Sequence, residues 1–156
     1  MAANSYTLHG LHILEYASGA PCLHDLKEAV DAIGTAISQS ASLLVVPMEN
    51  LDPQFFNLRT GMAGEIIQKF VTYRLRLAIV GDFSELTEES APLRDFIYEA
   101  NQGESVWFVS TIEELHAQIS REWDILNDGY VAWFQQFVNY TDSAYRAASF
   151  LGAKRR

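Results

Sequence analysis

Two patterns of hydrophobic residues alternate along most of the chain. Short apolar runs, which are typical of strands, occupy residues 6–8, 11–16, 42–46, 75–80 and 106–109. Apolar residues at three- and four-residue spacing, which are typical of one helix face, cover residues 24–38, 62–71, 93–100 and 112–119. Thr111 and Glu114 have the spacing of a capping box, which predicts that the last of these helices begins there.

The order of these patterns predicts the fold class. Two strands come first and helices then alternate with strands, which gives the order β-β-α-β-α-β-α-β-α. Strands that alternate with helices pair in parallel through right-handed crossovers. The first two strands flank Gly10 and predict a hairpin, which adds an antiparallel edge. We therefore expect an α/β domain with a mixed sheet and helices packed on it.

The C-terminal segment, residues 122–156, carries a different pattern. It holds eight of the 19 aromatic residues (3 Trp, 7 Tyr and 9 Phe). Its apolar residues recur at helical spacing, which predicts an added aromatic helix with a break near Thr141 and Asp142. The apolar face of this helix includes Leu126, Tyr130, Trp133, Phe134, Phe137, Val138, Ala144 and Ala148.

This aromatic face requires a partner, because each aromatic side chain can bury roughly 150–250 Å². Three partners are open: the chain's own sheet, a second subunit or other protein, and an apolar ligand. A membrane surface fits less well, because basic residues are scarce on the polar face. The chain thus divides into an α/β domain, residues 1–121, and a helical extension, residues 122–156, which packs on the domain or on a second subunit.

Composition and charge narrow the class of protein. With 156 residues, 49% apolar and 20% charged, the chain fits an ordinary globular protein. The net charge of −9 lies entirely in residues 1–121, which hold 16 acids and 7 bases, whereas residues 122–156 hold four of each. Such a surface excludes nucleic acid as a partner, because phosphate binding requires clustered Lys and Arg.

The sequence carries no motif for a metal, a cofactor or a membrane anchor. The one cysteine, Cys22, cannot form an internal disulfide, which favours a reducing compartment. The first residues lack the pattern of a secretory signal, and no apolar run approaches the length of a spanning helix. The four histidines lack the spacing of a zinc site. We expect a cytoplasmic protein that uses no metal or cofactor and does not enter the membrane.

Three segments carry a recognisable signature. They are FFNLRTGMAGEIIQKF at residues 55–70, LAIVGDFS at residues 77–84 and DFIYEANQG at residues 95–103. They resemble a bacterial family of domains of unknown function, number 4180. The similarity covers residues 5–120, and it implies no activity, because the family is named for its lack of a known function.

A second resemblance rests on the tetrad Leu58-Arg59-Thr60-Gly61, which precedes a predicted helix together with Met62. The order of elements and this position are similar to the STAS domain, the fold of anti-sigma-factor antagonists. That fold carries Asp-Ser-Ser-Gly-Leu here, and its second serine accepts a phosphate. Thr60 falls on the acceptor position, while Leu58 replaces the aspartate and Arg59 the first serine. The resemblance implies a STAS-like sheet and a regulatory role.

The start of this helix is the first candidate binding site. Free N–H groups at a helix N-terminus favour an anion, and Arg59 adds a positive charge beside Thr60. The alternative is that Thr60 is simply the N-cap. Gly61 and Gly64 each cost roughly 1 kcal/mol in a helix relative to alanine. Close packing of the helix on the sheet is the favoured reason for them, and the approach of a ligand is the alternative.

Two carboxylates complete the candidates. Glu65 lies one turn beyond Gly61, and Asp82 directly follows a buried strand. Ligands of open α/β sheets bind beyond the carboxyl ends of the strands. One of these groups could act as an acid or base if burial raised its pKa. The alternative is that both are ordinary solvated carboxylates, and no residue is assigned a catalytic role.

Two functions fit these observations. The first is a non-enzymatic regulatory or protein-interaction module of STAS-like type, which forms a homodimer or holds a protein partner through the C-terminal helix. The second is a small-molecule binding protein or small enzyme. Its pocket would lie between the carboxyl edge of the sheet and the aromatic helix. The polar groups of that pocket would come from Arg59, Glu65, Asp82 and Tyr130, and its apolar wall from Trp133, Phe134 and Phe137.

Overall fold

A computed structural model shows the fold of the chain. It describes residues 3–19 and 23–154, and within the last helix it describes only the backbone at positions 130, 137 and 140–154. Cys22 lies outside the described residues. The chain forms two units, Met1–Ala117 and Gln118–Arg156.

A five-stranded mixed sheet forms the centre of the first unit. Its strands are β1 (Ala3–Leu8), β2 (Leu11–Tyr16), β3 (Leu43–Pro47), β4 (Arg76–Val80) and β5 (Val106–Val109). They lie in the order of the sequence, with β1 antiparallel to β2 and every other pair parallel. His9 and Gly10 form the hairpin turn, both with positive φ, as a tight two-residue turn requires. The predicted mixed sheet with an antiparallel edge is confirmed.

Five helices accompany the sheet in the described chain. They are α1 (Leu26–Ser38), α2 (Met62–Thr72), α3 (Ser84–Glu89), α4 (Ala91–Gln102) and α5 (Ile112–Lys154). The loop between β3 and α2 adds three 3-10 turns: η1 (Met48–Asn50), η2 (Pro53–Phe56) and η3 (Leu58–Thr60). The order of strands and long helices agrees with the predicted one.

The two faces of the sheet carry different sets of buried residues. Leu14, Leu44 and Leu77 are paired across β2, β3 and β4, so they share one face. Ile13 and Leu43 are their neighbours along the strands and point to the opposite face, yet they are also fully buried. Both faces are therefore covered, which explains why the buried strands read as unbroken apolar runs.

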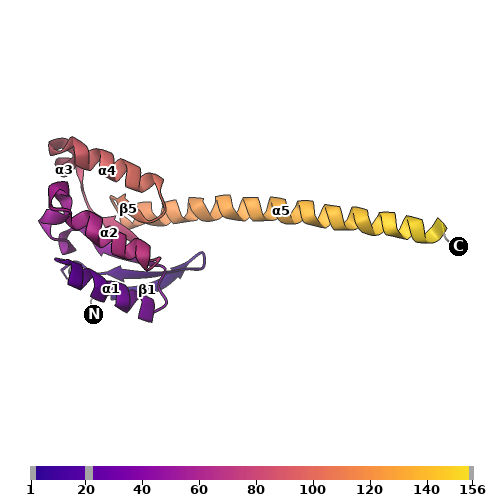
Figure 1. Cartoon of the computed structure of the whole chain (residues 1–156), viewed down its shortest axis with the longest axis horizontal. Coiled ribbons are helices and arrows are strands. Elements are labelled where there is room, and N and C mark those ends of the chain that lie inside the picture. The colour runs from indigo at the N-terminus through magenta and orange to yellow at the C-terminus, as the bar shows by residue number, and fades with distance from the viewer. Residues whose placement is uncertain (1–2, 20–22, 155–156) are drawn as a thin grey trace. The chain divides into compact units, whose positions relative to one another are not determined.

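The helices α1, α2 and α4 cover one of these faces, side by side in chain order (Figure 1). Because the parallel strands advance in one direction across the sheet, each right-handed crossover places its helix on the same face. The core between them contains Ile33 of α1, Phe70 of α2 and Leu93 of α4. No crossover helix is left for the opposite face.

That opposite face meets the first turns of α5. Leu115 is fully buried, and the Tyr6 hydroxyl forms a hydrogen bond of 2.8 Å with Nε2 of His116. Tyr6 pairs with Ile13 across the hairpin, so this bond lies on the face opposite α1, α2 and α4. Burial raises the pKa of the Tyr6 hydroxyl, and the neighbouring Glu15 raises it further. The hydroxyl therefore keeps its proton for hydrogen bonding.

The predicted capping box at the start of α5 is confirmed. Thr111 Oγ1 accepts a hydrogen bond of 3.1 Å from the backbone N–H of Glu114. The Glu114 carboxylate accepts one of 2.9 Å from the N–H of Ser110, one residue ahead of the cap. Two N–H groups that the helix cannot satisfy are thereby paired.

Three details of the helices differ from the expectation. The buried residues of α1 are Ala29, Ala32, Ile33 and Ala36. Ile37, which lies within the helical apolar pattern of residues 24–38, is 48% exposed. Residues 84–89, which lie outside the predicted strands and helices, form the short helix α3. Finally, α5 continues without interruption to Lys154, so the predicted break near Thr141 and Asp142 is wrong (Figure 1). Neither residue costs a helix more than about 0.7 kcal/mol, which long flanking helical segments outweigh.

A buried asparagine holds two loops of the first unit together. Asn50 is fully buried; its side-chain amide donates to the Ala17 carbonyl at 2.9 Å, and its side-chain oxygen accepts from the Gly19 N–H at 2.6 Å. Its backbone carbonyl accepts from the Leu23 N–H at 2.7 Å. These bonds fix the loop that follows β2 against η1. The hydrophobic pattern did not reveal this residue, because a polar side chain in a loop reads as solvated.

Asn101 closes the open edge of β5. Its side-chain oxygen accepts from the Phe108 N–H at 2.7 Å, and its side-chain amide donates to the Phe108 carbonyl at 3.1 Å. Both backbone groups that face away from β4 are thereby satisfied. The edge is therefore protected at this position against pairing with a foreign strand.

We predict that Asn50→Ala destabilises the first unit. The change removes the hydrogen bonds of the Asn50 side chain with the Gly19 N–H and the Ala17 carbonyl, and each lost hydrogen bond costs about 0.5–1.5 kcal/mol. Urea unfolding followed by far-UV circular dichroism measures the loss. Asn4→Ala, on the exposed side of the edge strand, is the control and should change stability by no more than about 0.5 kcal/mol. Equal stability of the two variants would contradict the role of Asn50 in holding the two loops together.

Candidate functional site

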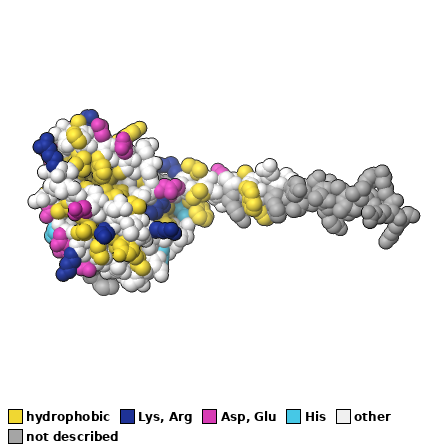
Figure 2. Space-filling view, viewed as in Figure 1, with side chains coloured by type: hydrophobic (Ala, Val, Ile, Leu, Met, Phe, Trp, Pro, Cys, Tyr) yellow, Lys and Arg dark blue, Asp and Glu magenta, His cyan; other side chains and the backbone are white. Residues whose placement is uncertain are grey.

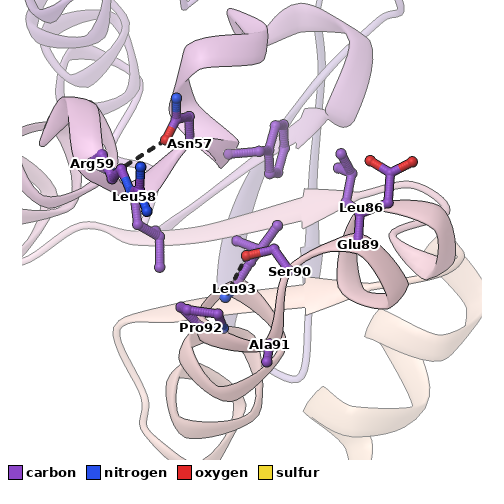
Figure 3. A pocket seen from close by; sticks show the side chains of 10 residues that line it. Asn57, Leu58, Arg59, Leu86, Glu89, Ser90, Ala91, Pro92 and Leu93 are labelled. Carbon is purple, nitrogen blue, oxygen red and sulfur yellow. Dashed lines mark hydrogen bonds between the residues drawn. The ribbon is translucent and has the colours of Figure 1, made fainter.

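The loops at the carboxyl ends of β3 and β4 enclose a hollow of about 570 Å³ (Figure 3). The turns η2 and η3 form one wall, and α3 and the start of α4 form the other. Its volume lies within the range of roughly 300–1,000 Å³ that small-molecule sites occupy. Its lining residues are Phe56, Asn57, Leu58, Arg59, Leu86, Glu89, Ser90, Ala91, Pro92 and Leu93.

The polar groups of this hollow are held by local turns (Figure 3). Asn57 Oδ1 accepts a hydrogen bond of 3.3 Å from the backbone N–H of Arg59, and Ser90 Oγ accepts one of 3.3 Å from Leu93. Arg59 brings a guanidinium to the lining and Glu89 a carboxylate, and both residues are exposed. The hollow therefore offers one cation and one anion, the kind of groups that orient a polar ligand.

A row of phenylalanine rings connects the two walls. The ring centroids of Phe56 and Phe83 lie 6.0 Å apart, and those of Phe83 and Phe108 lie 5.4 Å apart. Phe96 of α4 completes the row, 6.0 Å from Phe108. Such tilted and edge-to-face contacts stabilise beyond simple burial. Phe56, the member of this row that lines the hollow, is therefore held by the aromatic core.

Thr60 lies in the wall of this region, and its hydroxyl is fully engaged. The hydroxyl lies 2.9 Å from the carbonyls of both Gln54 and Asn57, and its oxygen accepts a 3.2 Å hydrogen bond from the N–H of Met62. The N-cap of α2 is Gly61 rather than Thr60, because the backbone at Gly61 still has a left-handed φ of 76°. Thr60 instead joins η2, η3 and the first N–H of the helix.

The two glycines of the motif have different reasons, and neither is the expected close packing. No atom lies within 4 Å of the place where a Cβ of Gly61 or Gly64 would stand. Gly61 is required by its positive φ, which costs other residues roughly 1–2 kcal/mol. Gly64 lies on the exposed side of α2 with helical geometry and open space. The structure contains no contact that explains why position 64 is glycine.

The two candidate carboxylates have separate local roles. Glu65 is exposed in the first turn of α2, where its negative charge interacts favourably with the helix dipole. Asp82 accepts hydrogen bonds from the hydroxyl and the N–H of Ser84, at 2.6 and 3.0 Å, and so opens α3. The Ser84 hydroxyl lowers the pKa of Asp82, and the Ser84 N–H lowers it further. A general acid needs a raised pKa, so the shift is in the opposite direction.

A smaller hollow of about 260 Å³ lies at the carboxyl ends of the strands beside the start of α5. Its lining residues are Glu15, Tyr16, Val45, Pro47, Glu49, Val80 and Ile112. The Ser18 hydroxyl donates to the Glu49 carboxylate, and this bond lowers the pKa of Glu49. Two carboxylates at one hollow make it unfavourable for an anionic ligand.

The second unit is the greater part of α5, and it exposes large apolar side chains. Among its described side chains, Trp133 is 58% and Phe134 is 49% exposed. The other exposed large apolar residues of this unit are Trp123, Ile125, Leu126, Val131 and Val138. Figure 2 shows hydrophobic side chains along the described part of the helix. The side chains of Tyr130 and Phe137 lie outside the described residues.

The candidate residues of the first unit do not converge on one site. Arg59 lines the hollow, Thr60 and Gly61 join η3 to α2, and Glu65 and Asp82 lie at the starts of helices. Among residues 3–19 and 23–154, no group of three or more metal-ligating side chains was found, and no helix has the length and hydropathy to cross a membrane. Sequence reasoning missed two other polar residues that line the hollow, Asn57 and Ser90, because they read as turn and cap residues.

One comparison with known proteins gives a match. Residues 8–119 match the family described as a domain of unknown function (DUF4180). No curated protein and no solved structure matches the chain. The matched residues include the strands β2 to β5, the helices α1 to α4 and the first turns of α5. They end before the exposed aromatic residues of α5 begin at Trp123. The likeness to the STAS domain stays a prediction.

We predict opposite effects of two glycine substitutions. Gly61→Ala should destabilise the chain by about 1–2 kcal/mol, because alanine resists the positive φ. Gly64→Ala should stabilise it by about 1 kcal/mol, because alanine favours the helix and meets no atom. Thermal and urea unfolding measure both. A destabilised Gly64→Ala variant would show that another group approaches this position.

We also predict that two serines control two carboxylates independently. Ser84→Ala should raise the pKa of Asp82 and leave that of Glu49 unchanged. Ser18→Ala should raise the pKa of Glu49 and leave that of Asp82 unchanged. Both folded pKa values lie below the ordinary ones, so these bonds stabilise the fold at neutral pH and lose their effect as the pH falls through the folded pKa. Carboxyl-detected NMR titration reads each pKa. A serine variant that shifts neither carboxylate would refute the assigned hydrogen bond.

Proposed function

This chain belongs to the DUF4180 family, and we propose that it is a regulatory protein-interaction module that acts in the cytoplasm. The contact element is the C-terminal part of α5, which holds a partner protein. The proposal assigns the α/β unit a supporting role and assigns no chemical reaction to the chain.

The observation that supports this proposal is the exposed apolar surface of α5. Seven large apolar side chains of this helix are exposed, from Trp123 to Val138. Burying a large apolar side chain stabilises by roughly 1.5–3 kcal/mol, so a partner could gain on the order of 10 kcal/mol from covering them. Exposed apolar patches of this kind mark interaction surfaces in folded proteins.

The composition of the surface fits a protein partner. Trp, Tyr and Phe are the residues enriched at the centres of protein interfaces. The sequence between Tyr130 and Tyr140, YVAWFQQFVNY, contains no charged residue. An interface centre is depleted of charge in the same way.

The hollow beside Arg59 supports a second candidate, the binding of a small polar molecule. Its volume of about 570 Å³ and its single guanidinium fit such a ligand. The surface of α5 supports the first proposal more strongly than the hollow supports the second. The charged residues of the hollow, Arg59 and Glu89, are exposed, and within the described part of the chain no hydrogen bond fixes their charged groups towards a common point.

Native mass spectrometry of the full chain from its own host tests the proposal. We expect complexes with masses above the 17.5 kDa of one chain. These complexes should dissociate in the variant Trp133→Asp. The affinity should fall by more than about tenfold, as for a central aromatic residue of an interface. An added mass of small-molecule size, lost in Arg59→Ala, would support the second candidate instead.

Gln135→Asp is the matched control for this experiment. It introduces the same side chain on the same helix, two residues away and also at an exposed position. We expect it to keep the complexes of the unchanged chain. A chain that is always found at 17.5 kDa, or complexes that survive in both variants, would contradict the proposed function.

A further inference from the structure

Trp123, Leu126 and Trp133, three of the exposed residues of α5, belong to a regular repeat. From position 123 onward, apolar residues recur in alternating steps of three and four along an unbroken helix. With Trp123 at position a of a heptad, Leu126 occupies d, Tyr130 the next a, Trp133 the next d and Phe137 the following a. The alternation continues to position 151, which makes about four heptads. Core positions sustained over this length are typical of a helix that pairs with another helix.

The size of the core residues changes along this repeat. The core positions up to Phe137 carry mostly aromatic residues. The later core positions carry Tyr140, Ala144, Ala147 and Leu151. The repeat is therefore bulky in its first half and contains two small residues in its second half.

This asymmetry decides between two ways of pairing two copies. In a parallel pair each core residue lies opposite itself, so Trp133 would meet Trp133 and Ala144 would meet Ala144. The bulky layers would hold the helices apart, and the alanine layers would enclose voids. Such voids cost roughly 24 cal/mol per Å³. In an antiparallel pair, positions a and d face each other, and one register places Trp133 opposite Ala144 and Tyr130 opposite Ala147.

The same antiparallel register matches the other core layers between positions 126 and 151. It places Phe137 opposite Tyr140 at the centre and Leu126 opposite Leu151 towards the ends. Each of these layers then holds either two residues of similar size or one large and one small residue. Helix axes can approach to the usual 8–10 Å throughout.

The charges of the segment reverse along the helix as well. Residues 122–142 hold four acids and no Lys or Arg, whereas residues 143–156 hold four bases and no acid. An antiparallel pair places the acidic part of each copy beside the basic part of the other. A parallel pair places like charges together, which is unfavourable.

We infer that the partner of α5 is a second copy of this chain, paired antiparallel through positions 126–151 with Phe137 and Tyr140 at its centre. This inference rests on the proposed function and names its partner. Four aromatic core residues in each copy, at roughly 150–250 Å² each, can bury the roughly 1,200 Å² of a stable interface. Phe134, at position e of the repeat, widens the apolar surface beside this seam.

Cysteine cross-linking of the full chain tests the orientation. Leu126→Cys and Leu151→Cys are made separately, each with Cys22→Ser so that the introduced thiol is the only one. In the antiparallel register positions 126 and 151 face each other within disulfide reach, whereas two copies of position 126 lie about 37 Å apart. We expect the mixed 126–151 disulfide as the dominant product when the two variants are mixed and oxidised. Dominant 126–126 and 151–151 products would overturn the antiparallel register.

A size exchange provides a second test that does not depend on oxidation. Trp133→Ala alone opens a void, and Ala144→Trp alone sets two tryptophans against each other. Each should weaken self-association by about tenfold or more in sedimentation equilibrium. The double variant restores one large and one small residue in the same layer, so its dimer should recover. A double variant weaker than both single variants would contradict this pairing.

The proposed function and this inference fail in different ways. Sedimentation of the unchanged chain should give twice 17.5 kDa. If the chain is monomeric but its complexes with another protein dissociate in Trp133→Asp, the inference is overturned and the interaction module stands. If Trp133→Asp changes neither the mass nor any complex, both are overturned.

Discussion

The sheet of this protein has two apolar faces, and both have to be kept from water. Its strands follow one another across the sheet in chain order, so every right-handed crossover helix falls on the same face. The other face carries residues such as Ile13 and Leu43, which are as buried as those beneath the crossover helices. Only an element that follows the last strand can cover it. The start of α5 does so through Leu115 and through the hydrogen bond between Tyr6 and His116.

This requirement gives α5 two different parts. Its first turns are a core element of the α/β unit, and the family match includes them, since it extends to residue 119. The later turns form a unit of their own, and their described side chains include seven exposed large apolar residues. A helix of 43 residues without interruption is longer than the burial of a sheet face needs. The extra length makes sense as a surface for a partner, and its size and charge patterns both favour a second copy in antiparallel orientation.

The α/β unit presents a less decisive surface. The hollow beside Arg59 has the volume of a ligand site, but its charged residues, Arg59 and Glu89, are exposed, and its other polar side chains, Asn57 and Ser90, are engaged in local turns. Thr60 is the residue at the phosphate-acceptor position of a STAS domain. Its hydroxyl is already hydrogen-bonded to the carbonyls of Gln54 and Asn57 and to the Met62 N–H at the start of α2. A modification there would have to break these bonds first. The balance of observations therefore places the proposed function on α5.

The sequence by itself determined the strands, the long helices and their order, because hydrophobic periodicity is a local property that each segment shows alone. It also determined the aromatic character of the last helix and the signature residues 55–70. Only the tertiary structure decided which residues meet across distance: Tyr6 with His116, Asn50 with the loop after β2, and Asn101 with Phe108. It also decided that Gly61 is required by its backbone angle while Gly64 is not, and that α5 is one helix rather than two. These outcomes depend on how strands pair and which face each helix covers, and periodicity along the chain carries no information about contacts between distant segments.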